Sequence, residues 1–513
     1  MAGAFPTPLT GSLYVVKLDS CQAVDAALPL FVYIVNFAPK SAEGKRSVSI
    51  GIDTLILFGV IGGVVGLAFL VPSFAPYRRK MPFVAFLLGI SSGFPLTLLL
   101  ATMTFWLSKV GIDKTTIGFA IGLTTPYTLK FLWAPLVDKL QLPVLTRLFG
   151  QRRAWLFLVQ ALLFGSLWQL GASNPSNDHL ALFAFWAIVV AFLSATQDIV
   201  IDAYRIEILS DAEIAHGTAM NQFGYRTGNL LAGAGTVYLA SSEGIGAGWA
   251  AAYAITAFLV LPAALGALWA GVGRYDPSTV RAAGQSFAQW AKETVINPFG
   301  EFLGRRGAVL ILLFVLIYKV GDAMGQGMLN PMIVELGFSD TEFIAINKFV
   351  GFAALIVGSA LGAPFIAWLG MGRALWVSGL LMMFSNVLFA LLASAGHSPM
   401  MLGLAVGTEN LTSGIGLTVF VTYLSGLSNL AYTATQFALL SSFAAVGRTW
   451  LAAPSGYVAD SLGWVGFWMF TVLVAVPGMA LLWVLWRRGF VVETVRQTAQ
   501  PEAATKPEPQ GSP

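Results

Sequence analysis

The sequence predicts an all-α membrane protein that crosses the bilayer many times. Of its 513 residues, 57% are hydrophobic and only 11% are charged, and the mean hydropathy is +0.75. Soluble domains carry about 25% charged residues, so this composition excludes a soluble protein. Apolar stretches of about 20 residues, the length at which a helix spans a bilayer, recur from residue 82 onward.

We expect twelve such spans, at 82–107, 115–137, 154–171, 180–202, 217–240, 249–272, 308–330, 343–368, 374–395, 399–425, 433–459 and 463–486. A polar stretch between the sixth and seventh spans divides them into two groups, and residues 286–295 within it predict a surface amphipathic helix. The expected organisation is an N-terminal extension (1–80), a first six-helix bundle (81–272), a cytoplasmic linker (273–307), a second six-helix bundle (308–488) and a disordered cytoplasmic tail (489–513).

The positions of lysine and arginine predict the orientation, because these residues accumulate on the cytoplasmic side of a membrane. If residues before Pro82 lie inside, nearly all cations of the connections are cytoplasmic, and Lys109 and Lys114 are the exceptions. Both ends of the twelve-span body are then cytoplasmic.

The two groups of spans resemble each other, which is typical of transporters built from structural repeats. Gly248-Trp249 is followed after thirteen residues by Pro262, and Gly463-Trp464 is followed after thirteen residues by Pro477. The preceding span carries Gly224-Tyr-Arg226 in one half and Gly447-Arg448 in the other. We therefore expect two related bundles with an arginine in the fifth span of each.

The loop between the second and third spans supports the same conclusion. It carries Asp138-Lys139 followed by Gly150-Gln-Arg152-Arg153, and the corresponding loop of the second half carries Gly370-Met-Gly372-Arg373. This arrangement resembles the gating-loop signature of the major facilitator superfamily. The resemblance implies the fold of that superfamily, with two six-helix bundles related by pseudo-two-fold symmetry. It also implies a cytoplasmic gate made by Asp138, Lys139, Arg152, Arg153 and Arg373. A role in topology alone is the competing interpretation of these cations.

Residues 1–80 do not fit the twelve-span plan. The stretch from Leu55 to Val71 is apolar enough to span a membrane, yet cations lie on both sides of it. Either Ala27 to Phe37 is a short second span, or residues 54–73 are re-entrant or peripheral, or the body of the protein opens at Met81. The segment is left unassigned.

Ionisable residues inside the expected spans are the strongest functional candidates. Each charge near the bilayer centre costs roughly 2.5 to 3.5 kcal/mol on insertion scales. Asp198 and Asp202 lie one helical turn apart and face the same way. The full set is Lys130, Asp198, Asp202, Arg226, Lys319, Asp322, Lys348, Glu409 and Arg448. We expect proton coupling at Asp198 first, then at Asp322 or Glu409, with Asp202 also a candidate; ion pairing alone is the competing interpretation for Lys319 with Asp322.

The remaining polar groups predict a hydroxyl-rich anionic ligand. Cations in a dehydrated site favour carboxylates, and amides supply both donors and acceptors to sugars. The expected substrate-binding residues are Lys348, Lys319, Arg448, Gln197, Lys130, Asn347, Asn410, Gln436, Gln222, Tyr225 and Arg226. Hydrogen bonding between helices is the alternative role for any single amide. Glycines 89, 93, 358 and 362 are expected to be points of close helix packing.

Other function classes find no support in the sequence. Cys21 is the only cysteine, and the three histidines, His179, His216 and His397, have no ligand-like spacing. We therefore expect no metal and no cofactor. No phosphate-binding loop and no nucleophile with a base are recognisable, which argues against an enzyme and for a transporter driven by an ion gradient.

A series of motifs carries a closer resemblance. These are residues 194–204 (SATQDIVIDAY), 129–138 (LKFLWAPLVD), 318–322 (YKVGD), 347–348 (NK), 409–410 (EN) and 433–441 (TATQFALLS). On these motifs, in chain order over residues 82 to 486, the sequence resembles the AmpG muropeptide permeases, in the peptide and acetyl-coenzyme A transporter branch of the superfamily. The resemblance implies proton-coupled import of 1,6-anhydro-muropeptides across the bacterial inner membrane by a monomer, with no nucleic acid as partner. Transport of another organic anion such as acetyl-coenzyme A, or a facilitator-like assembly factor that transports nothing, are the alternatives.

Overall fold

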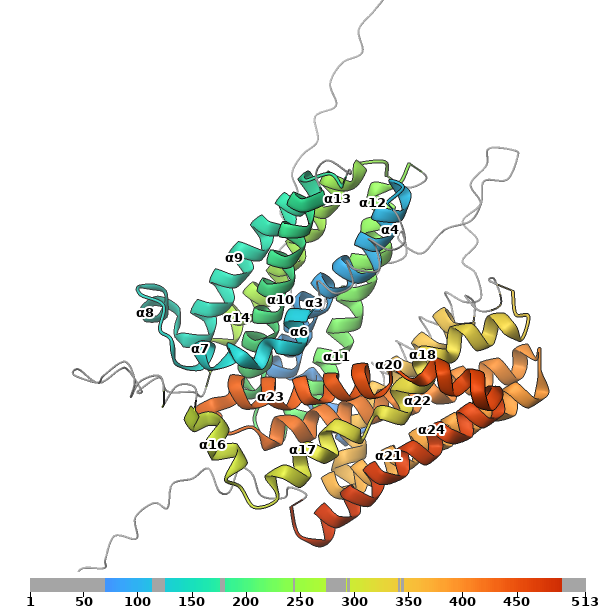
Figure 1. Cartoon of the computed structure of the whole chain (residues 1–513). Helices are drawn as coiled ribbons and strands as arrows, with labels where there is room; N and C mark the ends of the chain where they lie inside the picture. Colours follow the sequence, from blue (N-terminus) through green and yellow to red (C-terminus); the bar gives the residue numbers. More distant parts are fainter. Residues whose placement is uncertain are drawn as a thin grey trace, which may run out of the picture. The chain divides into compact units, whose positions relative to one another are not determined.

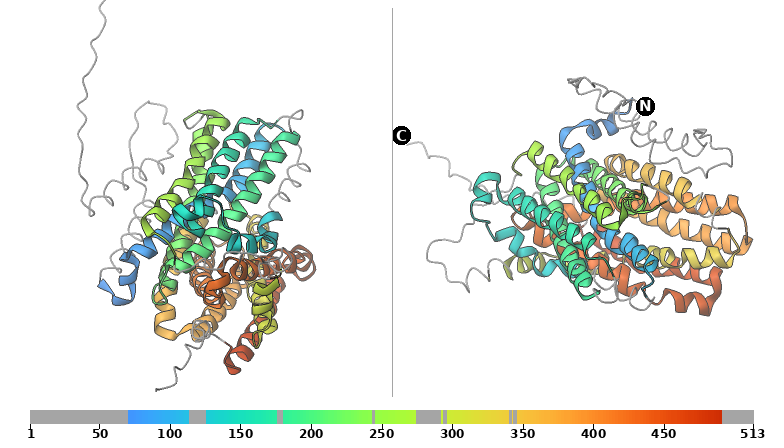
Figure 2. Two further views of the ribbon diagram at one scale, coloured as in Figure 1. Left: turned by 90° about the vertical axis from the view of Figure 1, so that its left-hand side faces the viewer. Right: turned by 90° about the horizontal axis from the view of Figure 1, so that it is seen from above.

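The computed structural model describes residues 70–112, 125–175, 180–242, 245–273, 292, 296–339, 342 and 346–490. Within these ranges the secondary structure is entirely helical. The helices of residues 80–270 run side by side, and so do those of residues 297–487 (Figures 1 and 2). The all-α expectation is therefore confirmed.

The first half begins with a short 3-10 helix, η1 (Pro72–Arg78), that leads directly into the first membrane helix. The spans of this half are α3 (Lys80–Thr97) with η2 (Leu98–Thr102) and α4 (Met103–Lys109); α6 (Thr125–Leu129) with η4 (Lys130–Leu132) and α7 (Ala134–Lys139); α9 (Gln151–Ala172); α10 (Leu180–Ile208); α11 (Ile214–Leu230) with η5 (Leu231–Gly235) and α12 (Thr236–Ala240); and α13 (Gly248–Thr256) with η6 (Ala257–Val260) and α14 (Leu261–Ala270). A surface helix, α8 (Leu145–Phe149), precedes α9.

The second half follows α16 (Asn297–Leu303). Its spans are α17 (Ala308–Ile317) with α18 (Val320–Glu335); η8 (Ile346–Gly351) with α20 (Phe352–Leu369); α21 (Met371–Ala395); α22 (Pro399–Leu427); η9 (Leu430–Tyr432) with α23 (Thr433–Val446) and η10 (Gly447–Leu451); and α24 (Ser455–Arg487).

Ten helical runs of the described residues are long and apolar enough to cross a membrane. They correspond to ten of the twelve expected spans. The run 214–240 is also a continuous helix, although its polar residues lower its hydropathy. The first part of the expected span 115–137, up to residue 124, lies outside the described residues.

The internal repeat is visible in backbone conformation. Gly248 and Gly463 both have positive φ angles, of 78° and 65°, a region that glycine enters without steric cost. Each of these glycines marks the point where the last span of its half begins, because α13 begins at Gly248 and the helical geometry of α24 is interrupted at Gly463.

A glycine also fixes the fifth span of each half against the first. A Cβ added at Gly224 of α11 would collide with the carbonyl oxygen of Phe86 in α3, and one added at Gly447 of η10 would collide with that of Leu316 in α17. Only glycine permits so close an approach of two helix backbones. Arg226 follows Gly224 by two residues, and Arg448 follows Gly447 directly. This close packing therefore fixes the positions of both arginines.

The four glycines expected at close-packing points behave as predicted. Gly89 and Gly93 contact the backbone of α11, and Gly358 and Gly362 contact α22. They bring α3 against α11 and α20 against α22.

Two span boundaries differ from expectation. The eleventh span ends at Leu451 and not at residue 459, because Pro454 follows and a proline interrupts helical hydrogen bonding. The seventh span is broken at Tyr318 and Lys319, so that α18 begins inside the membrane segment with Lys319 at its N-cap.

Several expectations lie outside the described residues. They are the hydrophobic stretches at 27–37 and 55–69, the amphipathic helix at 286–295 apart from Lys292, and the tail after residue 490. The domain boundaries remain predictions.

Candidate functional site

The two aspartates of α10 have different partners. Asp198 accepts a hydrogen bond of 2.6 Å from the hydroxyl of Ser92 in α3. Asp202 lies 3.8 Å from the ammonium of Lys130 and 3.6 Å from the guanidinium of Arg205. Within the described part of the chain, no cation lies at ion-pair distance from Asp198. The aspartates therefore divide into one that is paired with cations and one that is held by a hydroxyl.

The second half repeats this division. Asp322 of α18 lies 3.7 Å from the ammonium of Lys319. Glu409 of α22 accepts hydrogen bonds from the hydroxyls of Ser385 at 2.6 Å and Ser413 at 2.9 Å. No cation that the structure describes forms an ion pair with Glu409. The expected ion pair between Lys319 and Asp322 exists. Each half also contains one carboxylate, half-buried in Asp198 and buried in Glu409, that accepts hydrogen bonds from serine hydroxyls.

The arginines of the two fifth spans come from opposite halves and lie close enough to interact electrostatically. Arg226 is half-buried in α11, and Arg448 is exposed in η10. Tyr225 interacts electrostatically with both arginines and with Asp198. Neither arginine has an ion-pair partner among the residues that the structure describes. Two cations from opposite halves thus influence each other electrostatically.

Helix irregularities accompany these arginines. Arg448 lies inside the π-helical turn η10, and the π-helical turn η5 follows five residues after Arg226. Such turns are frequent at functional sites. Lys319 stands at the break between α17 and α18, where the N-terminus of a half-helix favours an anion.

The expected substrate-binding amides separate into two groups. Gln197 is fully buried and donates to the carbonyl of Ser91, and Asn410 donates to the carbonyl of Val406 one turn back. The side chain of Gln436 contacts Pro298, Glu301, Arg305 and Asn429 at the end of α23. These contacts give Gln197 and Gln436 structural roles, since burial against protein partners leaves them no free face.

Gln222 and Tyr225 are half-buried on the helix that carries Arg226, which leaves them available to a ligand. Asn347 and Lys348 belong to η8 by their backbone, and their side chains lie outside what the structure describes.

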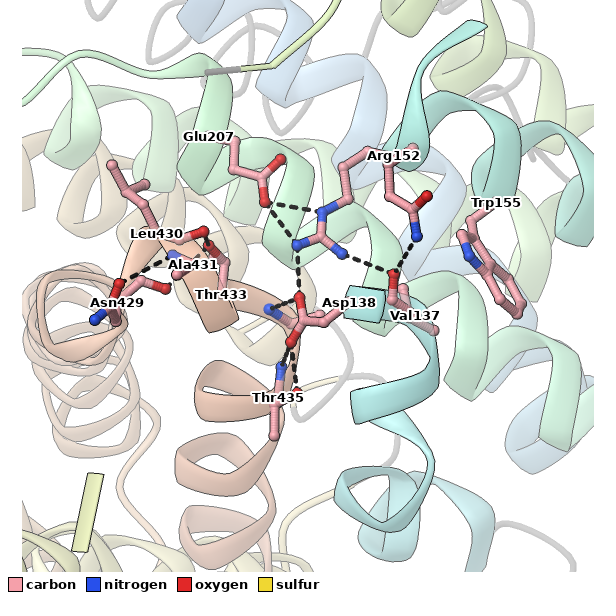
Figure 3. A network of polar contacts seen from close by, with 12 residues as sticks. Val137, Asp138, Arg152, Trp155, Glu207, Asn429, Leu430, Ala431, Thr433 and Thr435 are labelled. Atoms are coloured by element: carbon pink, nitrogen blue, oxygen red, sulfur yellow. Dashed lines mark hydrogen bonds and ion pairs between the residues drawn. The ribbon is translucent and has the colours of Figure 1, made fainter. Parts of the chain in front are cut away.

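The expected gate is a network that joins the two halves at the end of α7 (Figure 3). The buried carboxylate of Asp138 accepts hydrogen bonds from the backbone N–H groups of Ala434 at 3.1 Å and Thr435 at 2.8 Å, in the first turn of α23. Negative charge is stabilised at a helix N-terminus. Arg152 lies 2.6 Å from Asp138 and 2.8 Å from Glu207. The network therefore holds α7, α9 and α10 of the first half to α23 of the second.

The other expected gate residues differ in their contacts. The ammonium of Lys139 lies 4.8 Å from the ring centre of Tyr432, across the halves. Arg153 donates to the carbonyl of Phe149 within its own half. Arg373 is exposed, and no described residue pairs with it. The contacts between the halves are thus asymmetric: Asp138, Lys139 and Arg152 of the first-half loop take part in them, whereas no described contact across the halves involves Arg153 or Arg373.

The comparisons with known proteins agree with this geometry. The family model described as Major Facilitator Superfamily matches residues 85–452. The chain is 36% identical over 409 residues to the anhydromuropeptide permease of Escherichia coli K12, covering 80% of each chain. It belongs to the major facilitator superfamily, in the AmpG permease family. A putative transporter named AmpG 4 from Rickettsia conorii is 34% identical over 412 residues, which cover 80% of this chain and 97% of the relative.

A solved structure supports the fold independently. The human organic anion transporter MFSD10 superposes with a TM-score of 0.59 over 79% of this chain and 99% of its own, at 16% identity. At that identity the likeness shows the fold alone. The chain is accordingly a multi-pass membrane transporter of the superfamily fold.

Two buried charged residues that connect helices were not predicted as site residues from the sequence. Glu207 is fully buried beside Arg152, and Arg205 is fully buried, with hydrogen bonds to Thr218 at 2.9 Å and to Ser425 of the second half at 3.2 Å. The available signal was the Tyr204-Arg205-Ile-Glu207 sequence, in which two charges directly continue an apolar helix.

Proposed function

We propose that this protein is a proton-coupled importer of 1,6-anhydro-muropeptides, sugar fragments with or without peptide, for peptidoglycan recycling. The observation that carries the proposal is the pair of arginines, Arg226 and Arg448, which come from opposite halves, interact electrostatically and have no ion-pair partner among the described residues. Uncompensated charge in a membrane protein is costly and marks a substrate path. An anionic substrate from outside the chain supplies the missing negative charge.

The chemistry of a muropeptide fits these groups. Its muramyl and peptide carboxylates pair with Arg226, Arg448 and Lys319, and guanidinium groups bind carboxylates in bidentate geometry. Its sugar hydroxyls exchange hydrogen bonds with Gln222 and Tyr225 beside Arg226. The names of the relatives, anhydromuropeptide permease among them, support this substrate class.

Asp198 and Glu409 are the proposed proton carriers, one in each half. Both accept hydrogen bonds from serine hydroxyls, and neither forms an ion pair with a described cation. Asp202 and Asp322 lie at ion-pair distance from the ammonium groups of Lys130 and Lys319. We therefore assign Asp202 and Asp322 to balancing Lys130 and Lys319.

Import also needs alternating access. In the proposed cycle, the Asp138 network closes the cytoplasmic end while substrate enters from the periplasm, and it opens when the halves rock about the central site. The orientation follows from the cations of the expected cytoplasmic connections. A bacterial inner membrane and a monomeric state complete the proposal.

Uptake of labelled anhydro-muropeptide by right-side-out membrane vesicles tests the proposal. We expect accumulation in energised vesicles and its loss when a protonophore collapses the proton gradient. Accumulation that resists the protonophore would contradict proton coupling, and no uptake of muropeptide by correctly inserted protein would contradict the substrate.

Another organic anion such as acetyl-coenzyme A would use the same arginines. Competition separates the two, because unlabelled anhydro-muropeptide should abolish uptake of the label and a nucleotide thioester should not. An assembly factor that transports nothing has no need of two arginines without ion-pair partners among the described residues, one in the fifth span of each half.

A further inference from the structure

The 3-10 helix η1 lies between the two halves. It packs against α3 and α11 of the first half and against α20 of the second. Its sequence, Pro72-Ser-Phe-Ala-Pro-Tyr-Arg78, begins with proline and contains another at Pro76. Proline fixes φ, so this short helix has little conformational freedom to lose when it docks.

The contacts of η1 with the first half are extensive. Nε2 of His216 in α11 lies 2.8 Å from the carbonyl oxygen of Ser73, and the ring of Tyr77 stands edge-on to the His216 ring at 4.8 Å. Phe74 is only 2% exposed. These contacts make η1 part of the first half.

An ion pair fixes the junction between η1 and α3. Arg79, the residue between them, lies 3.3 Å from Glu213, just before α11. Partial burial raises the pKa of Glu213, but hydrogen bonds from Ser210 and Arg79 outweigh it and hold the pKa below its ordinary value. Glu213 is therefore ionised at neutral pH and keeps its pair with Arg79.

The contacts of η1 with the second half are two side-chain hydrogen bonds. The hydroxyl of Tyr77 donates to the carbonyl of Ala360 in α20 at 2.8 Å, and the indole N–H of Trp368 in α20 donates to the hydroxyl of Ser73 at 3.0 Å. These bonds must break when α20 moves away from α11.

We infer that η1 is a strap that holds the two halves together at the gate end, in addition to the Asp138 network. Tyr77, Ser73 and Trp368 are its positioning residues: they touch no substrate, and they favour the state in which this end is closed. The strap acts on the equilibrium between open and closed ends. It does not depend on the identity of the substrate, so it can be tested without one.

Spin-label distances measure that equilibrium directly. Replacing Cys21 with serine removes the only cysteine, and Leu148→Cys with Arg373→Cys then places labels at two exposed positions, one in each half. In the full-length protein in lipid nanodiscs, Tyr77→Phe and Trp368→Phe should each raise the ratio of open to closed distances about fivefold, the equivalent of ~1 kcal/mol for one neutral hydrogen bond.

Matched controls lose the same kind of bond within one half. Tyr204 donates to the carbonyl of Ala267, and Trp155 donates to that of Leu140, both inside the first half. Tyr204→Phe and Trp155→Phe should leave the distance distribution unchanged.

A double-mutant cycle adds a second criterion. Ser73→Ala removes the acceptor of the indole N–H and leaves the backbone contact with His216 intact. Ser73→Ala and Trp368→Phe should therefore produce no larger shift together than either one alone. Distance distributions that match the controls in Tyr77→Phe and Trp368→Phe, or additive effects in the cycle, would overturn the strap.

Discussion

Asp138 and Thr435 lie 297 residues apart in the sequence, yet the carboxylate of one accepts the backbone N–H of the other at 2.8 Å. The bond joins the loop after the second span to the first turn of α23 in the opposite half. Arg152 pairs with the same carboxylate. One buried side chain therefore forms an ion pair within the first half and caps a helix of the second half.

Asp138→Asn should open the cytoplasmic end. The substitution keeps the size of the side chain but removes the charge that pairs with Arg152 and faces the helix N-terminus. A hydrogen bond to a charged group contributes about 1.5 to 3 kcal/mol, so the opening equilibrium should shift about ten- to hundredfold. We expect normal membrane insertion and severely reduced uptake. The central cavity should become more accessible to a thiol-reactive probe that is added from the cytoplasmic side. Arg153→Gln, outside the gate, is the control, and normal uptake by Asp138→Asn at normal abundance would refute the gate.

Asp198→Asn should abolish concentrative uptake while keeping substrate exchange. Asparagine can still accept the hydroxyl of Ser92, but it cannot carry a proton. Vesicle uptake against a gradient and counterflow exchange are the two measurements. Asp460→Asn, an exposed position of α24, should retain both. If the Asp198 variant still accumulates substrate, proton coupling lies elsewhere, and Glu409→Gln becomes the next test.

Arg448→Gln should weaken binding of a peptide-bearing muropeptide about ten- to hundredfold, because it removes one charge-assisted contact of about 1.5 to 3 kcal/mol. A neutral sugar analogue should lose much less. Isothermal titration with both ligands separates a role in charge recognition from a structural one. Arg373→Gln, exposed at the start of α21, is the control. Equal losses for both ligands would assign Arg448 to structure. The same comparison applies to Lys348→Ala.

Gly447→Ala should destabilise the protein by about 1 to 3 kcal/mol, the usual cost of overpacking. The added methyl group meets the carbonyl oxygen of Leu316, a backbone atom that cannot move alone. The thermal unfolding midpoint in detergent measures the effect. Gly403→Ala, in a helix position with open space around it, should be neutral or stabilising. A Gly447 variant as stable as this control would show that α17 and η10 do not pack closely.

The sequence by itself determined the features that depend on local composition. Hydropathy depends on each stretch of about 20 residues alone, so the membrane helices and the repeated Gly-Trp starts at 248 and 463 were predictable. The charged residues inside the spans were predictable too, because an ionisable residue within a span is recognisable without knowing its neighbours. The resemblance of short ordered motifs identified the family for the same reason.

Only the tertiary structure decided which groups meet. Asp198 and Asp202 look equivalent in the sequence, yet one contacts a serine of α3 and the other a lysine of η4. Arg153 and Arg373 were expected to act with Asp138, yet Arg153 contacts its own half and Arg373 is exposed. Ser73, which carried no local signal, connects η1 to α20. Partners brought together by packing lie tens to hundreds of residues apart. Their contacts depend on how the helices pack, and no local pattern of the sequence contains that information.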